Sequence, residues 1–142
     1  MTKSIERKIK KTEERLQRLK IIADTLSSFA DYQKSLDVKD IAERNLQVAI
    51  ETCLDIGKII ISKERLNEPK DNKGVFIVLS ESGYLSEKSI SFMLPMAGTR
   101  NILVHGYDKV DDSLIYGILK RHLGDFTIFL DEIKNNYLIK NK

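Results

Sequence analysis

Apolar side chains recur at steps of three and four residues along most of the chain, the period of an α-helix that buries one face. A first helix is predicted from Ser4 to Phe29 and a second from about Asp37, its expected N-cap, to about Leu66. The polar segment 31–35 between them is expected to be a connection. The first helix carries an apolar stripe made of Ile5, Ile9, Leu16, Leu19, Leu26 and Phe29. The second carries a heptad seam, typical of antiparallel bundles, made of Ala42, Leu46, Ala49, Cys53, Ile56 and Ile60.

The region after the second helix contains one short element. Proline, asparagine and glycine residues break the apolar period between residues 67 and 74. The apolar run Val75–Ser80 that follows fits either a buried strand or a short helix. Because a single strand would have no partner elsewhere in the sequence, a short helix that ends at Gly83 is predicted.

Two further long helices are predicted after it. Ser86 is expected to cap a helix from Glu87 to about His105, in which Pro95 should cause a kink or a local break. The last helix follows, capped by one of the aspartates at 111–112. Its apolar face carries Tyr116, Leu119, Leu123, Phe126, Leu130 and Ile133. The polar tail 135–142 is expected to fray.

These elements predict an all-α fold, an antiparallel helical bundle of four long helices plus a short one, in a single domain covering residues 1–142. A hydrophobic content of 42% and a charged content of 32% are typical of a globular domain. The one cysteine, Cys53, lies in the seam, so neither an internal disulfide nor a cysteine metal cluster is expected. The charged N-terminus is unlike a signal peptide, and no apolar run approaches the ~20 residues of a membrane span, which indicates a cytoplasmic protein.

The charge of the chain is mild overall but unevenly distributed. The formal net charge is +3, and lysines and arginines concentrate in the first twenty residues. A basic helix there could contact RNA phosphates or an acidic protein. A solvated helix face is the simpler interpretation for that segment.

The candidate chemistry gathers between residues 100 and 107. Arg100, Asn101, His105 and Tyr107 lie there within eight positions, around a short apolar run. Histidine exchanges protons near neutral pH, and the planar guanidinium of arginine suits phosphate oxygens. Such a pair is sufficient to cleave an RNA phosphodiester without a metal, leaving a 2′,3′-cyclic phosphate if the 2′-hydroxyl attacks. The other interpretation is structural, because basic residues at a helix end also complement the helix dipole.

The spacing of this pair constrains how it could act. Residues five apart on a helix point about 140° away from each other, so Arg100 and His105 cannot share one face of a straight helix. Either the turn at Gly106 redirects His105, or a second copy of the chain completes the site. Asn101 lies one turn before His105, where its amide could orient the imidazole or contact a phosphate.

A second group of polar residues lies on one face of the second helix. Arg44, Glu51 and Asp55 are spaced to form either a solvated ion-pair face or a polar wall facing a cleft. The other histidine, His122, flanks the apolar face of the last helix and is interpreted as structural. Two isolated histidines do not make a metal site, and phosphate-loop and dinucleotide motifs are missing, so no metal or cofactor is expected.

The segment Arg100-Asn101-x-x-x-His105-x-Tyr107 resembles the R-x4-H-x-Y motif of HEPN-domain proteins, specifically the HepT-like toxins. Residues 42–51 are similar to the second-helix pattern of the same group. The resemblance covers about Ile5 to Ile133 and implies a metal-independent endoribonuclease that acts as a homodimer, with the motif lining a cleft between the subunits. By position, Arg100 and His105 would be the catalytic pair, with Asn101 as a supporting residue.

The same resemblance implies a regulatory partner. HepT-like toxins are paired with a minimal nucleotidyltransferase antitoxin of the MntA type, which transfers AMP to the motif tyrosine, here Tyr107. The resemblance also implies an acidic site residue on the second helix, which would be Glu51 or Asp55. An alternative is a non-catalytic helical subunit that presents Tyr107 to a nucleotidyltransferase and uses Arg100 and His105 to bind nucleotide phosphates.

Overall fold

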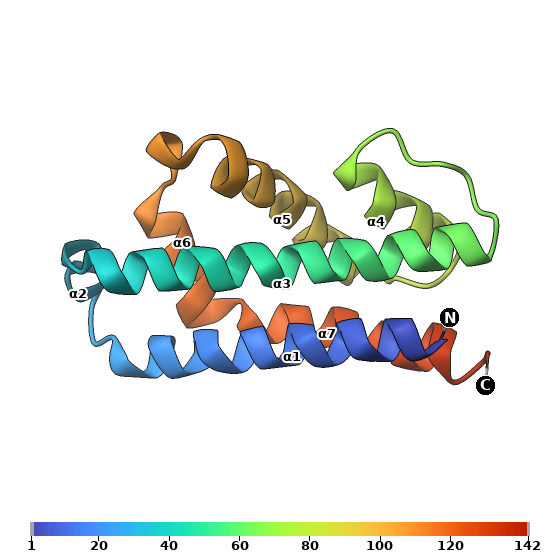
Figure 1. Cartoon of the computed structure of the whole chain (residues 1–142), viewed down its shortest axis with the longest axis horizontal. Coiled ribbons are helices and arrows are strands. Elements are labelled where there is room, and N and C mark those ends of the chain that lie inside the picture. The colour runs from blue at the N-terminus through green and yellow to red at the C-terminus, as the bar shows by residue number, and fades with distance from the viewer. Residues whose placement is uncertain (1, 142) are drawn as a thin grey trace.

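A computed structural model of the chain describes residues 2–141, with every side chain among them except that of Tyr107. The four longest helices run in alternating directions along the bundle (Figure 1). They are α1 (Thr2–Thr25), α3 (Leu36–Lys63), α5 (Glu87–His105) and α7 (Leu123–Ile133). No strand occurs within residues 2–141, so the predicted all-α antiparallel bundle is confirmed.

Helices α1 and α3 form the most extensive pair of the bundle and lie side by side over their whole lengths (Figure 1). All six residues of the predicted seam on α3 are fully buried, Cys53 included. Burial raises the pKa of the Cys53 thiol, as expected for an inert core residue. Within this apolar contact, the hydroxyls of Thr12 and Thr52 lie 2.6 Å apart, so that one donates a hydrogen bond to the other.

The connection between these helices differs from the prediction. Helix α1 ends at Thr25, and the segment expected to be a polar connection contains a short helix, α2 (Phe29–Lys34). The hydroxyl of Ser28 caps α2 by accepting the Asp31 N–H, and Tyr32 anchors α2 with a fully buried ring. Ser35, and not Asp37, caps α3, by accepting the Val38 N–H at 3.3 Å.

The predicted short helix and motif helix are both present, although the short helix begins three residues before the apolar run Val75–Ser80, inside the predicted break. Helix α4 (Asn72–Glu81) is capped by Asp71, and the chain turns at Gly83 with a φ of +86°. Helix α5 is capped by Ser86 and ends before Gly106, as expected. It runs through Pro95 without the local break that was considered.

The prediction that one continuous helix forms the end of the bundle is wrong. The segment forms α6 (Asp112–Arg121) and α7, separated by His122, whose φ of −126° and ψ of 4° leave the helical region. Asp111 caps α6 by accepting the Ser113 N–H. The break lets α6 cross the end of the bundle steeply while α7 lies along α1 (Figure 1). The spacing of apolar residues continues across His122, so it could not reveal that the chain changes direction there.

The tail is held against the bundle by contacts with distant residues, so the prediction that it frays is wrong for its first part. A π-helix, η2 (Lys134–Leu138), continues α7 and buries Tyr137 and Leu138. The Tyr137 hydroxyl donates to Glu64 Oε2 at 2.9 Å, and its ring packs edge-on against Tyr84. Burial is the main cause of a raised pKa of Tyr137, and the hydrogen bond to Glu64 is the second cause. Residue 142 of the predicted tail lies outside the described residues.

We expect Tyr137→Ala to lower the free energy of unfolding by about 3–5 kcal/mol, because it empties a fully buried aromatic site. Denaturant titration followed by circular dichroism would measure the loss. Ile139→Ala is the matched control, because Ile139 is 63% exposed and should change stability by less than about 0.5 kcal/mol. Equal effects of the two changes would show that the tail is not part of the core.

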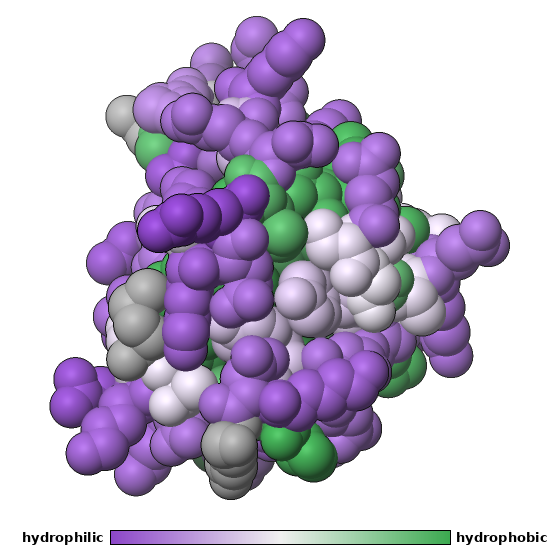
Figure 2. Space-filling model, turned by 90° about the vertical axis from the view of Figure 1, so that its right-hand side faces the viewer, coloured by the Kyte–Doolittle hydropathy of each residue, from purple (hydrophilic) through white to green (hydrophobic). Residues whose placement is uncertain are grey.

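The surface of the bundle is mainly polar. Figure 2 shows the end of the bundle near α4 and the chain termini covered largely by hydrophilic side chains, with a smaller hydrophobic area between them. No helix within residues 2–141 is both long and apolar enough to cross a membrane.

Candidate functional site

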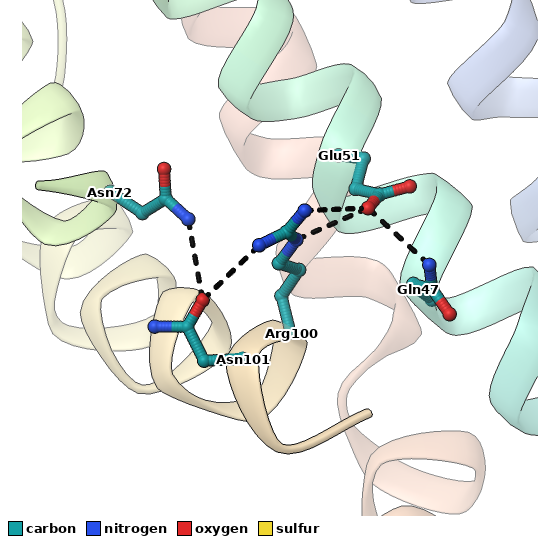
Figure 3. Close-up of polar contacts among 5 residues, drawn as sticks. All are labelled: Gln47, Glu51, Asn72, Arg100 and Asn101. Carbon is teal, nitrogen blue, oxygen red and sulfur yellow. Dashed lines mark hydrogen bonds and ion pairs between the residues drawn. The ribbon is translucent and has the colours of Figure 1, made fainter. Parts of the chain in front are cut away.

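The residues of the motif occupy the last turns of α5 and the start of a 3-10 helix, η1 (Tyr107–Lys109). Met93, Ala97 and Leu103 bury the core side of α5 and fix its rotation. Arg100 lies at the edge of this buried face, where α5 meets α3 (Figure 3). The helix ends where the Gly106 N–H donates to Ile102 O at 2.8 Å.

An ion pair with Glu51 of α3 fixes the Arg100 guanidinium. Nε and Nη2 of Arg100 donate to the same oxygen, Glu51 Oε2, at 3.1 and 3.0 Å (Figure 3). Gln47, one turn earlier on α3, donates to that oxygen at 3.3 Å. The Arg100 and Glu51 side chains are 25% and 31% exposed, so the pair is only partly screened by solvent.

Asn101 joins this network through its carbonyl oxygen. Oδ1 accepts from Arg100 Nη1 at 3.3 Å and from Asn72 Nδ2, on the first turn of α4, at 3.4 Å. Within the described residues its amide makes no hydrogen bond to His105, so the expected orienting contact with the imidazole is not seen. Three helices, α3, α4 and α5, therefore meet at the Arg100 head group (Figure 3).

The Arg100 head group keeps donors that can bind a ligand. A guanidinium has five N–H groups. Glu51 takes the Nε proton and one Nη2 proton, and Asn101 takes one Nη1 proton. One N–H on each terminal nitrogen is left, which suits two oxygens of a phosphate. The arrangement holds the guanidinium in place and leaves part of it available.

A pocket of about 280 Å³ opens beside this head group. Its lining residues are Glu51, Leu54, Asp55, Lys58, Asn72 and Arg100. Within residues 2–141, no group of three or more His, Cys, Asp or Glu side chains is placed to hold a metal ion.

The structure separates the two acidic candidates of the predicted polar wall. Glu51 contacts Arg100, whereas Asp55 Oδ2 pairs with Lys8 of α1 at 3.1 Å. Both still line the pocket. Arg44 is exposed on α3 and makes no side-chain hydrogen bond or ion pair with the described residues.

His105 lies apart from the pocket that Arg100 lines. It is the last residue of α5, is exposed, and makes no side-chain hydrogen bond within the described part of the chain. The divergence of the two side chains agrees with the helix geometry of their five-residue spacing. The backbone of Tyr107 begins η1, two residues further on, while its side chain lies outside the described residues.

Three residues at the site were missed by the sequence analysis. Gln47 could have been found, because it lies one turn before Glu51 on the same helix face. Lys58 could have been found in the same way, because it lies three residues after Asp55 and seven after Glu51 on α3. Asn72 carried no such signal, since it reaches the pocket only through the packing of α4. His122 is consistent with its structural interpretation: Nδ1 contacts Asp125 at 2.9 Å and the ring stacks on Phe92.

Three comparisons with known proteins bear on this arrangement. The model of the family described as Ribonuclease HepT-like matches residues 12–133. The mRNA nuclease HepT of Shewanella oneidensis is 27% identical over 116 residues, which cover 82% of this chain and 87% of that protein. The tRNA nuclease HepT of Aphanizomenon flos-aquae is 31% identical over 112 residues, or 79% of this chain and 76% of that protein.

A solved structure extends the likeness to three dimensions. The tri-AMPylated HEPN toxin of Shewanella oneidensis, in complex with an MNT antitoxin, superposes with a TM-score of 0.84 at 26% identity. The match covers 92% of this chain and 96% of that one. Family match, sequence identity and fold agree, and the chain belongs to the Ribonuclease HepT-like family.

Proposed function

We propose that the chain is a metal-independent endoribonuclease, the toxin of a pair whose antitoxin is a nucleotidyltransferase. The observation that carries the proposal is the Arg100 guanidinium, held by Glu51 beside an open pocket with N–H groups left for a phosphate. Its family relatives are named as mRNA and tRNA nucleases, and a structural relative is a HEPN toxin bound to an antitoxin.

In the proposed reaction, the 2′-hydroxyl oxygen attacks the adjacent phosphorus, and the bond to the 5′-oxygen of the next nucleotide breaks. His105 transfers a proton, either from the 2′-hydroxyl or to the departing 5′-oxygen. Arg100 binds the phosphate oxygens and stabilises the charge that develops on them. The products are a 2′,3′-cyclic phosphate and a 5′-hydroxyl. Detection of only 3′-hydroxyl ends would contradict this route.

The proposal includes a homodimer. Arg100 and His105 diverge within one chain, and His105 is exposed without a partner among the described residues. A two-fold axis beside α5 would place His105 of one subunit near Arg100 of the other. Both would then face one phosphate, which a single chain does not achieve.

Tyr107 is the proposed site of AMP transfer. Its phenolic oxygen would attack the α-phosphate of ATP, pyrophosphate would leave, and the phenolic proton would be lost. The tri-AMPylated state of the structural relative supports this assignment. A bulky anionic group two residues from His105 would block access to the site and compete for Arg100.

Glu51 should act as a positioning residue for Arg100. We expect Glu51→Gln to reduce kcat/KM for RNA cleavage by roughly ten- to hundredfold, because Arg100 loses a charge-assisted contact worth about 1.5–3 kcal/mol. Glu81→Gln makes the same chemical change at an exposed residue at the end of α4, outside the pocket, and should leave cleavage nearly unchanged. A loss in Glu81→Gln as large as that in Glu51→Gln would refute the assignment.

Expression without the antitoxin tests the proposed function against the non-catalytic alternative. The nuclease should arrest growth and degrade cellular RNA, and His105→Ala should abolish both effects at equal protein level. A subunit that only presents Tyr107 should be harmless alone. Absence of growth arrest by folded wild-type protein free of AMP would contradict the nuclease proposal.

A further inference from the structure

The pocket beside Arg100 is larger than one phosphate contact requires, and most of its lining residues lie outside the motif. We propose that it binds one nucleobase of single-stranded RNA and selects a base that carries an exocyclic amino group. Asp55 and Asn72 would be the specificity-determining residues. This inference rests on the proposed function, since it takes RNA as the substrate.

The acceptor oxygens around the pocket favour a base over a second phosphate. Glu51 and Asp55 both line it, and each already pairs with a cation, Arg100 and Lys8 respectively. Lys58 is the one lining cation that makes no ion pair within the described residues. The two ion pairs cancel in charge, so the charge of the pocket does not exclude a phosphate. The acceptor oxygens of Asp55 and Asn72 would nevertheless face the oxygens of a second phosphate, acceptor against acceptor, whereas an amino group of a base could donate to them.

The hydrogen-bonding groups of the pocket match the edge of an amino-bearing base. Asp55 Oδ1 and Asn72 Oδ1 accept no hydrogen bond from the described residues, since Asp55 uses Oδ2 for Lys8 and Asn72 uses Nδ2 for Asn101. Figure 3 shows the Asn72 carbonyl oxygen pointing away from Asn101. Acceptors of this kind bind the amino groups of cytosine and adenine. Lys58 can donate to a ring nitrogen or carbonyl.

Uracil fits the same groups poorly. Cytosine and uracil have the same size, but cytosine carries an amino donor where uracil carries a carbonyl acceptor. That carbonyl would face the Asp55 carboxylate, acceptor against acceptor. The pocket should therefore distinguish the two pyrimidines.

The position of the pocket also suits a base next to the cleaved bond. Arg100 lies at its edge, with two N–H groups left for phosphate oxygens, and Leu54, only 2% exposed, is its one apolar lining residue. Bases of single-stranded RNA are commonly splayed out, stacked on guanidinium planes and bound by their edges. One nucleotide could place its phosphate on Arg100 and its base between Asp55 and Asn72.

Binding of two short RNAs tests the proposal independently of cleavage. Labelled six-nucleotide strands of cytidine only and of uridine only would be titrated against His105→Ala protein at one fixed salt concentration. We expect the cytidine strand to bind about five- to tenfold more tightly, as one hydrogen bond gained and one repulsion avoided would give. In the same background, Asn72→Ala should reduce this ratio towards one. Asp55→Asn should reduce it further, because an amide can donate to uracil.

Asn67→Ala is the matched control, because Asn67 is exposed in the preceding loop and does not line the pocket. It should leave the ratio unchanged. Equal binding of the two strands, a ratio that neither pocket variant alters, or no binding of either strand would overturn the inference. Wild-type protein that fails to cleave RNA, while the binding ratio still depends on Asn72, would refute the nuclease function and leave the base pocket standing.

Discussion

Arg100→Ala should reduce kcat/KM for RNA cleavage by roughly a thousandfold, the size of effect seen when a preorganised group that stabilises transition-state charge is removed. The guanidinium is positioned by Glu51 and Asn101 before substrate binds, so little reorganisation is needed during the reaction. Arg100→Lys should lose nearly as much, since a lysine keeps the charge but cannot contact Glu51 and a phosphate through a planar fork. Single-turnover cleavage of a labelled RNA would measure both variants.

This prediction needs a control for folding, because Arg100→Ala leaves Glu51 half-buried without its partner. Thermal unfolding should show a modest loss of stability, and the assay should be run well below the midpoint. Arg121→Ala, an exposed residue at the end of α6, makes the same chemical change away from the site and should cleave like the wild type. Arg100→Ala protein that is folded and fully active would remove Arg100 from the mechanism.

Tyr107→Phe should make the toxin almost completely resistant to silencing by its antitoxin. Phenylalanine keeps the ring but lacks the phenolic oxygen that would receive AMP. Cells that carry the nucleotidyltransferase should therefore tolerate the wild-type chain and be arrested by the variant. Intact mass should show adenylylated wild-type protein and unmodified variant. Tyr116→Phe, a half-buried tyrosine of α6, should still be silenced. A Tyr107→Phe chain that stays harmless and gains AMP would place the modification elsewhere.

The parts of the fold that were predictable depend on local chemistry. The α3 seam follows from a strict spacing of apolar residues, and all six seam residues are fully buried. The motif helix follows from a serine cap before it and a glycine after it, and both ends match. Each signal lies within a few residues of the structure that it determines.

The parts that were missed depend on contacts between distant segments. Tyr137 is buried because its ring meets Tyr84 and its hydroxyl meets Glu64, partners far away in the sequence. A polar tail gave no hint of this. The chain likewise changes direction at His122 without any interruption of the apolar spacing on either side.

The same distinction applies to the site. Glu51 and Asp55 are one turn apart on α3, about 40° apart in direction, so periodicity could not choose between them. The packing of neighbouring helices decides: α5 brings Arg100 to Glu51, and α1 brings Lys8 to Asp55. Asn72 reaches Asn101 across α4 and α5, a contact that spacing along one helix could not show.

RNA cleavage by purified protein in excess EDTA would test the central claim most directly. Mass spectrometry would first confirm that Tyr107 carries no AMP. The account predicts that wild-type protein cleaves single-stranded RNA under these conditions, leaves 2′,3′-cyclic phosphate ends, and loses this activity in both Arg100→Ala and His105→Ala. Wild-type protein that is folded, unmodified and inactive, or cleavage that persists in both variants, would contradict it.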